Sequence, residues 1–270
     1  MTYKLVASDV DGTLINSAER ISPRLYRALE CTSGRYHFVI ATGRPARWVI
    51  PLVNQLPFKP VCICANGAVV YDSARDRIIK NHSIQAEVLR AVVSKAREVL
   101  PVGVAVERCG TSVLDINQGC YVVTEDYAHA WDSTEHSVVD LDSALAEPAV
   151  KLLLRYEALT APELFDLIRP AIPTDLVHIT YSINEGLLEV SAPNITKAQT
   201  LKELCDDMGI AAKDVLAFGD MRNDREMIEW AGHGVAMANA QQELRACADE
   251  VTASNDDDGV ARILERVFGQ

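Results

Sequence analysis

Short apolar runs alternate with amphipathic stretches in the opening part of the chain. Residues 4–8, 36–41 and 61–65 have the length and composition of buried strands. Ser22 marks the start of one intervening helix, and a second helical stretch follows Pro45. Strands that alternate with helices in this order predict an α/β fold, with a parallel sheet and helices on both of its faces.

The pattern changes between residues 83 and 190, where a long helical segment is followed by alternating apolar runs. This segment is typical of an α+β domain, with extended runs expected at 102–107, 112–116, 151–156 and 176–189. The last of these runs has the pattern of a hairpin with its turn at Asn184-Glu185-Gly186.

The first pattern returns after residue 194, with a helix expected over 196–208 and a strand over 215–219. The simplest domain organisation is therefore discontinuous. We expect an α/β core made of residues 1–82 and 191–270, interrupted by an inserted α+β domain over 83–190.

Composition and charge narrow the class of protein. The 270 residues are 49% hydrophobic and 24% charged, as in an ordinary globular protein, and the formal net charge is −12. This charge disfavours nucleic acid and anionic membrane surfaces as partners, because both would repel the chain. A site for a phosphorylated small molecule would then depend on a metal ion and a few well-placed cations.

The seven cysteines are an odd number, and only Cys62 and Cys64 lie close together in the sequence. Alternation places these two on the same face of an expected strand, where we interpret them as small buried hydrophobic residues. No apolar run reaches the length of a signal peptide or a membrane span. We expect a reduced, cytoplasmic protein.

Asp9 and Asp11 follow the first expected strand, at the edge where open α/β sheets bind their ligands. In an extended chain the two carboxylates would face one spot, and they would repel each other unless a cation or a shared proton intervened. One interpretation is a Mg²⁺ site in which Asp9 attacks phosphorus and Asp11 transfers a proton. The alternative is a plain turn, which Asp-Gly also favours.

Two further motifs offer contacts to a phosphate. Thr42 and Gly43 follow the second expected strand and offer a hydroxyl and a backbone N–H, although Thr-Gly is also an ordinary turn and helix cap. Lys197 begins an expected helix, so that its ammonium and the helix end would both attract an anion. A single lysine at such a place is usually a surface residue.

The fourth motif follows the strand over 215–219. Asp220 offers a further carboxylate to a Mg²⁺ ion, and Asp224 is expected to support the ligands rather than to bind the metal directly. Asn223 is either a ligand contact or the cap of the next helix. All four motifs fall on strand ends of one expected sheet, and this common position favours a single site.

Through these motifs the chain resembles the haloacid dehalogenase superfamily of phosphatases, and most closely its Cof-type subfamily (class IIB, with a C2B cap). The residues that carry the resemblance are Asp9-x-Asp11-Gly-Thr, Thr42, Lys197 and Gly219-Asp220-x-x-Asn223-Asp224, together with Asn66-Gly67-Ala68 and Asn255-x-x-Asp258-Gly259. The resemblance covers the core, whereas the insertion matches only in its placement and its expected α/β content.

The resemblance implies a Rossmann-like core and a mobile cap domain that closes over the active site. It implies Mg²⁺ as cofactor, bound by Asp9, the backbone carbonyl of Asp11, and Asp220. It also implies Asp9 as nucleophile and Asp11 as acid and base. The phosphate contacts that it implies are the backbone of Val10, Thr42, Gly43, Lys197 and Asn223.

The expected function is hydrolysis of a small phosphorylated metabolite, such as a sugar phosphate, through an aspartyl-phosphate on Asp9. A phosphomutase on the same architecture is an alternative, and a non-catalytic phospho-ligand sensor is another from a different class. The sequence does not identify the substrate or the oligomeric state. Arg44 and Asn66 are further candidates for substrate contact, with a charge at a helix start and a turn residue as the alternative interpretations.

Overall fold

The computed structural model describes residues 3–113, 119–129 and 136–269 of the chain. The chain divides into two compact units, Met1–Ile79 with Thr196–Gln270, and Lys80–Ile195. The sequence led us to expect the insertion at 83–190. Part of the expected run at 112–116 lies outside the described residues.

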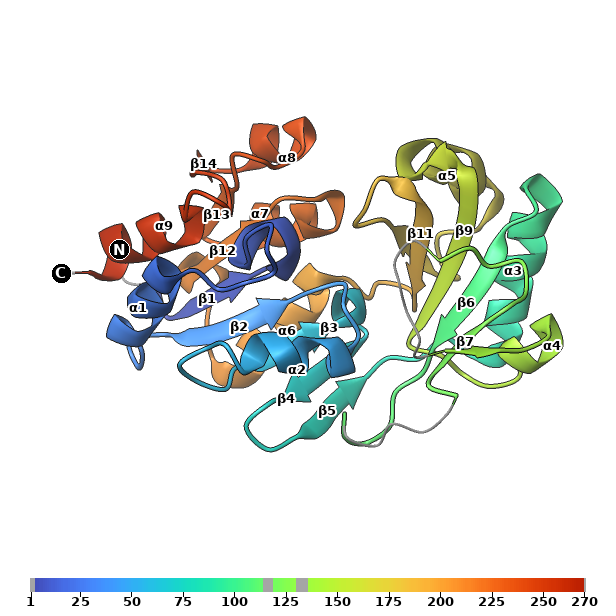
Figure 1. Ribbon diagram of the computed structural model, residues 1–270, viewed down its shortest axis with the longest axis horizontal. Coiled ribbons are helices and arrows are strands. Elements are labelled where there is room, and N and C mark those ends of the chain that lie inside the picture. Colours follow the sequence, from blue (N-terminus) through green and yellow to red (C-terminus); the bar gives the residue numbers. More distant parts are fainter. Residues whose placement is uncertain (1–2, 114–118, 130–135, 270) are drawn as a thin grey trace. The chain divides into compact units, whose positions relative to one another are not determined.

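The first unit is built on an eight-stranded sheet with the order β14-β13-β12-β1-β2-β3-β4-β5 (Figure 1). Neighbouring strands are parallel from β14 to β3, and β4 is antiparallel to β3, which confirms the predicted parallel core. The strands are β1 (Leu5–Ser8), β2 (His37–Ala41), β3 (Val61–Cys64), β4 (Val69–Asp72), β5 (Arg77–Asn81), β12 (Val215–Gly219), β13 (His233–Ala236) and β14 (Glu250–Val251).

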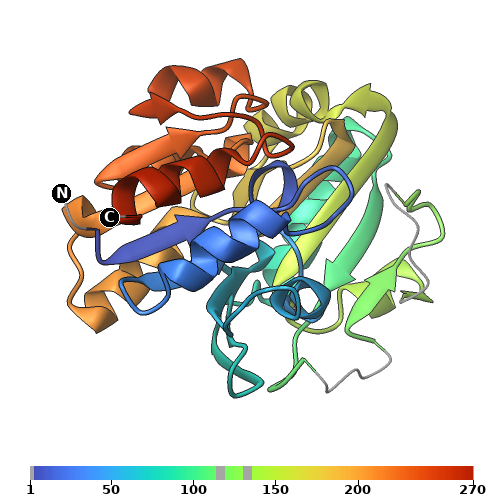
Figure 2. The ribbon, with the colours of Figure 1, turned by 60° about the vertical axis from the view of Figure 1, so that its left-hand side comes forward.

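Six α-helices accompany the described part of this sheet: α1 (Pro23–Cys31), α2 (Ala46–Val53), α6 (Lys197–Met208), α7 (Arg225–Trp230), α8 (Gln242–Cys247) and α9 (Gly259–Phe268). The predicted start of α1 is confirmed, because the Ser22 hydroxyl accepts the backbone N–H of Leu25 at 3.0 Å. Helices α1 and α9 pack against each other, as do α6 and α7. Figure 2 shows α1 in blue and α9 in dark red.

The strand order reverses beside β1. From β1 the chain proceeds to β2 and β3, whereas from β12 it proceeds to β13 and β14 in the opposite direction across the sheet. Since parallel crossovers are right-handed, the connecting helices of the two halves lie on opposite faces. Folds of this kind bind their ligands at the carboxyl ends of the two strands where the order reverses, which are β1 and β12 here.

The centre of the sheet is a continuous apolar layer. Every residue of β1 and of β12 is buried, as expected for strands covered by helices on both faces. Cys62 and Cys64 are also fully buried, and burial raises the pKa of the Cys62 thiol to about 12. This confirms their interpretation as small hydrophobic residues. Among the described helices, none is long and apolar enough to cross a membrane.

The second unit contains a six-stranded sheet with the order β10-β11-β9-β6-β7-β8. Its strands are β6 (Gly103–Glu107), β7 (Tyr121–Val123), β8 (Ser137–Val138), β9 (Lys151–Thr160), β10 (His178–Thr180) and β11 (Glu185–Ser191). Its α-helices, within the described residues, are α3 (Ala86–Val99), α4 (Leu141–Ala144) and α5 (Ala161–Ile168). Thr160 and Glu163 form a capping box that fixes the start of α5.

The hairpin predicted in this unit is present and is centred between Asn184 and Glu185, but Gly186 belongs to a strand and not to the turn. Strands β10 and β11 pair in antiparallel register, but the connection between them covers residues 181–184. Gly186 lies inside β11, at an irregularity in its pairing with β9. A methyl group at Gly186 would overlap the carbonyl oxygens of Tyr156 and Leu159. The glycine is therefore needed because β11 and β9 approach closely here. A close contact between strands favours glycine, just as a turn does.

The substitution Gly186→Ala tests this close packing. We expect it to lower the free energy of unfolding by about 2 kcal/mol, because the added methyl group has no space without movement of β9. The exposed residue Asn184, two positions earlier, provides the control, since Asn184→Ala should change stability by less than about 0.5 kcal/mol. Urea unfolding and hydrogen exchange of β9 amides measure both. Equal effects of the two substitutions would contradict the packing argument.

Candidate active site

Asp9 lies directly after β1, where the strand gives way to a tight turn over Val10–Leu14. Its backbone N–H donates to the carbonyl oxygen of Phe218 at 3.0 Å, which continues the pairing of β1 with β12 by one residue. Gly12 has a φ of 73°, and a methyl group there would overlap the carboxylate of Asp220. Only glycine combines this backbone conformation with this close approach. The turn thereby brings two strand-end carboxylates together.

Lys197 connects two of the buried carboxylates. Its Nζ donates to Oδ1 of Asp9 at 2.6 Å and to Oδ1 of Asp224 at 2.7 Å, and its side chain is 1% exposed. The other oxygen of Asp224 accepts the backbone N–H groups of Asp220 and Met221 at 3.1 and 3.0 Å. Asp224 is thus fully engaged by the protein, as expected for a residue that supports the site rather than binding a metal.

The start of α6 explains how Lys197 reaches this place. Thr196 caps the helix by accepting the N–H of Gln199 at 3.1 Å, so Lys197 occupies the first helical position. The expectation that an isolated lysine at a helix start lies on the surface does not hold here, because this side chain is buried. Its ammonium adds to the positive end of the helix beside Asp9.

The cluster has an excess of negative charge. Oxygen atoms of Asp9, Asp220 and Asp224 lie within 4.8 Å of one another, and one buried ammonium faces them. Burial, and then the charge of Asp224, raises the pKa of Asp9 well above its usual range and that of Asp220 to about 7. Burial alone would lower the pKa of Lys197, but Asp224 and Asp9 raise it overall. The ammonium therefore stays charged.

These carboxylates fit a divalent cation. Three buried carboxyl groups face one ammonium, so ionisation of all three would leave an uncompensated charge, and buried charge is costly unless it is paired or bound to a metal. Oxygen is also the ligand that Mg²⁺ prefers. Asp9 and Asp220 come from adjacent strand ends, so they could hold one ion together.

Thr42 and Gly43 follow β2 at the same edge of the sheet. Thr42 is completely buried, its N–H donates to the carbonyl of Ile63 at 2.8 Å, and its hydroxyl accepts the N–H of Arg44 at 3.0 Å. The hydroxyl proton remains available for an acceptor such as a phosphate oxygen. Gly43 is half-buried between these two residues.

Asp11 is placed differently from Asp9. Its side chain is 54% exposed, and both of its oxygens accept hydrogen bonds from Arg44, at 2.9 Å from Nε and 2.5 Å from Nη2. The Asp11 carboxylate does not belong to the buried acidic cluster. The alternation of an extended chain suggested that both carboxylates face one spot, but the chain turns after Asp9 and Arg44 holds Asp11 separately.

Asn66 and Asn223 form a pair of side-chain amides. Nδ2 of Asn223 donates to Oδ1 of Asn66 at 3.0 Å. Asn66 has a φ of 56°, and its own backbone N–H donates to the carbonyl oxygen of Thr42. Asn223 makes no side-chain bond that caps α7, so the capping interpretation does not hold. Its Oδ1 is buried and has no hydrogen-bond partner within the described part of the chain.

Two residues support the site without having been predicted. The Thr13 hydroxyl donates to Oδ1 of Asp220 at 3.0 Å, and Nδ2 of Asn239 donates to the carbonyl of Gly12 at 2.8 Å. Thr13 belongs to the same motif as Asp9 and could have been included on that basis. Asn239 lies in a loop after β13 with no distinguishing pattern around it, so only its position in the fold identifies it.

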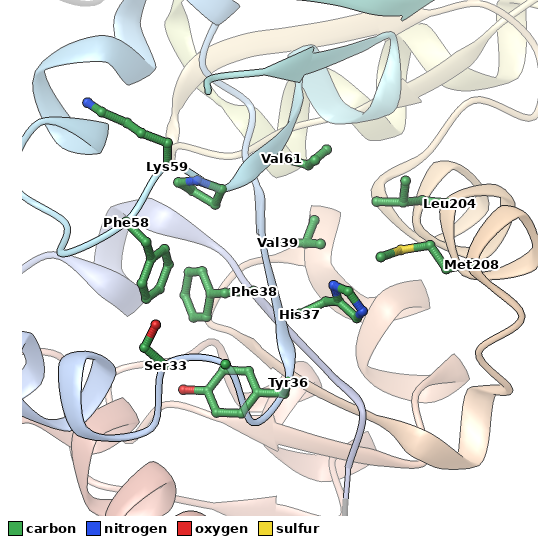
Figure 3. A pocket seen from close by; sticks show the side chains of 12 residues that line it. Ser33, Tyr36, His37, Phe38, Val39, Phe58, Lys59, Val61, Leu204 and Met208 are labelled. Atoms are coloured by element: carbon green, nitrogen blue, oxygen red, sulfur yellow. The ribbon is translucent and has the colours of Figure 1, made fainter. Parts of the chain in front are cut away.

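A separate pocket of about 250 Å³ lies at the amino ends of strands of the same sheet, opposite the ends that carry the acidic cluster (Figure 3). Residues at the amino ends of β2 and β3, among them His37 and Val61, line it with Phe58 from the preceding loop and Met208 from α6. This pocket contains none of the carboxylates described above. The candidate active site is therefore the strand-end cluster.

The substitution Lys197→Met tests how strongly the cluster depends on its ammonium. We expect the free energy of unfolding at pH 8 to fall by about 3 kcal/mol, since buried carboxylates lose their ion pair. Lys202 lies on the exposed face of the same helix, and Lys202→Met should change stability by less than about 0.5 kcal/mol. Urea unfolding in EDTA compares the two variants. If both variants lose less than about 0.5 kcal/mol of unfolding free energy, the ion pair does not stabilise the fold.

The raised pKa of Asp220 predicts a pH-dependent difference between the native chain and Asp220→Asn. Its pKa is about 7 in the folded protein, against an ordinary value of 3.8, so between these values the folded state binds more protons than the unfolded chain. Stability then falls as pH rises, by at most about 1.4 kcal/mol per pH unit. Asparagine has no charge to bury.

We therefore expect Asp220→Asn to be more stable than the native chain at pH 8 in EDTA, with the gap narrowing as pH approaches 4. Urea midpoints at several pH values measure this gap. A gap that stays constant with pH would show that the substitution acts through packing instead of charge.

Comparison with known proteins agrees with this geometry. The family model described as haloacid dehalogenase-like hydrolase matches residues 6–264. A protein of Haemophilus influenzae that is named as a phosphatase is 30% identical, over 99% of both chains. The 5-amino-6-(5-phospho-D-ribitylamino)uracil phosphatase YitU of Bacillus subtilis is 27% identical, over 98% of this chain and 97% of its own.

A solved structure is similar throughout. The crystal structure of a haloacid dehalogenase-like hydrolase from Bacteroides thetaiotaomicron is 28% identical and has a TM-score of 0.76, covering 98% of this chain and 100% of that one. The predicted resemblance to Cof-type phosphatases of this superfamily is confirmed. The chain belongs to the haloacid dehalogenase-like hydrolase family, as an enzyme of the phosphatase class.

Proposed function

We propose that this phosphatase hydrolyses a small phosphorylated metabolite, such as a sugar phosphate, through an aspartyl-phosphate formed on Asp9. The observation that carries this proposal is the contact of Lys197 with Asp9 in a buried cluster at the ends of β1 and β12. A carboxylate fixed in this way by an ammonium is oriented for attack, and the ammonium lies where phosphoryl charge would develop.

In the first step an oxygen of Asp9 forms a bond to phosphorus while the ester oxygen leaves. Asp11 donates its proton to that leaving oxygen. In the second step water attacks the phosphorus, gives its proton to Asp11, and the bond to Asp9 breaks with release of inorganic phosphate. Lys197 stabilises the phosphoryl charge in both steps, as in phosphoryl transfer generally.

The site suits Mg²⁺, which when bound would offset the charge of the phosphoryl group and of the carboxylates. Its ligands would be Asp9, Asp220 and the backbone carbonyl of Asp11. Asp224 would hold Lys197 and the backbone after β12 in place, because its two oxygens already accept from the protein. Oxygen atoms of Asp9 and Asp220 lie within 4.8 Å of each other, which supports these two carboxylates as ligands of one ion.

The phosphoryl oxygens would be held by the hydroxyl of Thr42, the backbone N–H groups of Val10 and Gly43, and the side chain of Asn223. Oδ1 of Asn223 is the buried atom without a partner, and an oxygen there would repel a phosphate. Turning the amides of Asn223 and Asn66 together keeps their mutual hydrogen bond and replaces this oxygen by Nδ2. A donor would then face the phosphate.

The second unit, Lys80–Ile195, is the proposed cap that selects the leaving group. The relative YitU acts on a phosphorylated ribitylaminouracil, which supports a small phosphorylated metabolite as the substrate class. All seven cysteines are free thiols, which supports a cytoplasmic location for the enzyme.

The substitution Asp9→Asn tests the mechanism. We expect Mg²⁺-dependent release of phosphate from p-nitrophenyl phosphate to fall by at least about 10³-fold, because the amide is a poor nucleophile and a poor metal ligand. Asp166→Asn, at an exposed position of α5, should leave the rate unchanged. A circular dichroism spectrum confirms that both variants fold. Substantial activity of the folded Asp9→Asn variant would rule out the aspartyl-phosphate route.

A further inference from the structure

Asp11 is the proposed catalytic residue with the least support from the protein interior. Asp9, Asp220 and Lys197 are at most 7% exposed, whereas the side chain of Asp11 is 54% exposed. An exposed aspartate exchanges between rotamers unless a partner restrains it. Its contacts therefore decide whether its carboxyl group is in place when the ester bond breaks.

Arg44 is that restraint. Nε and Nη2 of Arg44 contact the two different oxygens of Asp11, at 2.9 and 2.5 Å. This parallel pair of hydrogen bonds fixes the plane of the carboxylate as well as its position, which a single contact would not do. The hydrogen bond to Asp11 raises the pKa of Arg44 further, as expected when Asp11 is ionised. When Asp11 carries the proton for the leaving group on one oxygen, its other oxygen can still accept from Arg44 and keep the carboxyl group in place.

The backbone of Arg44 is held on both sides. Its N–H donates to the hydroxyl of Thr42 at 3.0 Å, and its carbonyl accepts the N–H of Ala65 at 2.9 Å. The loop that carries Thr42 thus also carries the guanidinium group. Arg44 therefore connects the proposed phosphate contact, Thr42, with the proposed proton donor, Asp11.

The separation of Asp11 from the acidic cluster fits proton transfer to a leaving oxygen. In an in-line displacement the leaving oxygen lies on the far side of phosphorus from the attacking oxygen of Asp9. A carboxyl group packed into the cluster with Asp9 and Asp220 would lie on the same side of phosphorus as Asp9, away from the leaving oxygen. Arg44 holds Asp11 outside that cluster.

We propose that Arg44 is the positioning residue for Asp11, and that this contact makes the enzyme effective on esters whose leaving groups require a proton. This inference rests on the proposed function, in which Asp11 is the general acid. Arg44 acts through Asp11 and does not itself bind the leaving group. Its importance should accordingly depend on how basic the leaving oxygen is.

The experiment compares two aryl phosphates of similar shape, phenyl phosphate and p-nitrophenyl phosphate, in the presence of Mg²⁺. Phenol has a pKa of about 10, like tyrosine, and needs a proton in order to leave. The nitro group makes p-nitrophenol far more acidic, so that it leaves without one. The quantity measured is kcat/KM, which reports phosphoryl transfer to the enzyme and not the second step.

For Arg44→Ala we expect kcat/KM to fall by about tenfold or more with phenyl phosphate, as for partial loss of general acid catalysis, and by less than about threefold with p-nitrophenyl phosphate. Arg44→Lys should be intermediate, since one point charge replaces a planar pair of donors. Arg27→Ala, at an exposed position of α1, is the control and should change neither value.

The variant Asp11→Asn distinguishes the inference about Arg44 from the proposed role of Asp11. If it shows the same dependence on the leaving group, and Arg44→Ala adds no further loss to it, Arg44 acts through Asp11. If Asp11→Asn shows the dependence and Arg44→Ala does not, the inference about Arg44 is wrong and the proposed function stands. If Asp11→Asn shows no dependence, the proposed role of Asp11 fails. An equal fall with both substrates for Arg44→Ala would mean that Arg44 binds the phosphate itself.

Discussion

The contact of one buried ammonium with two buried carboxylates is the interaction on which the site depends. Lys197 lies between Asp9 and Asp224 at 2.6 and 2.7 Å, and all three side chains are buried. Buried ions are tolerated only when they are paired and hydrogen-bonded, so each member of this group fixes the others. The same group holds more negative than positive charge, which makes it a place for a metal ion and a poor place for an unaccompanied anion.

The fold brings this group together from distant parts of the chain. Asp9 and Asp220 meet because β1 and β12 are neighbours at the point where the strand order reverses. Lys197, 188 positions from Asp9, reaches them from the start of α6. Parallel strands end at one edge, so that residues following them converge without long loops. Strand order therefore positions the residues of the proposed chemistry, and we propose that the inserted unit selects the substrate.

Sequence reasoning recovers the features that depend on local pattern. The strands that carry Asp9 and Asp220, and the start of α1 at Ser22, follow from apolar runs and capping residues alone. It does not recover features decided by packing between distant segments. The pairing of Asp11 with Arg44 and the hydrogen bond from Asn239 to Gly12 depend on how loops fold against each other, and the local sequence of these loops does not predict it. Gly186 shows the same limit, since a turn and a close strand contact both favour glycine.

The position of β1 has a consequence for biosynthesis. Its partner β12 follows some two hundred residues later, and the hydrogen bond between Thr13 and Asp220 spans 207 positions. While the chain is being made, β1 can pair with β2, but its other edge stays open until the whole inserted unit has been synthesised. Such non-local pairing is slow and leaves an apolar strand exposed. A chain interrupted before residue 197 would contain Asp9, the proposed nucleophile, and would lack the ammonium of Lys197 that contacts it, so the acidic cluster is completed only late in synthesis.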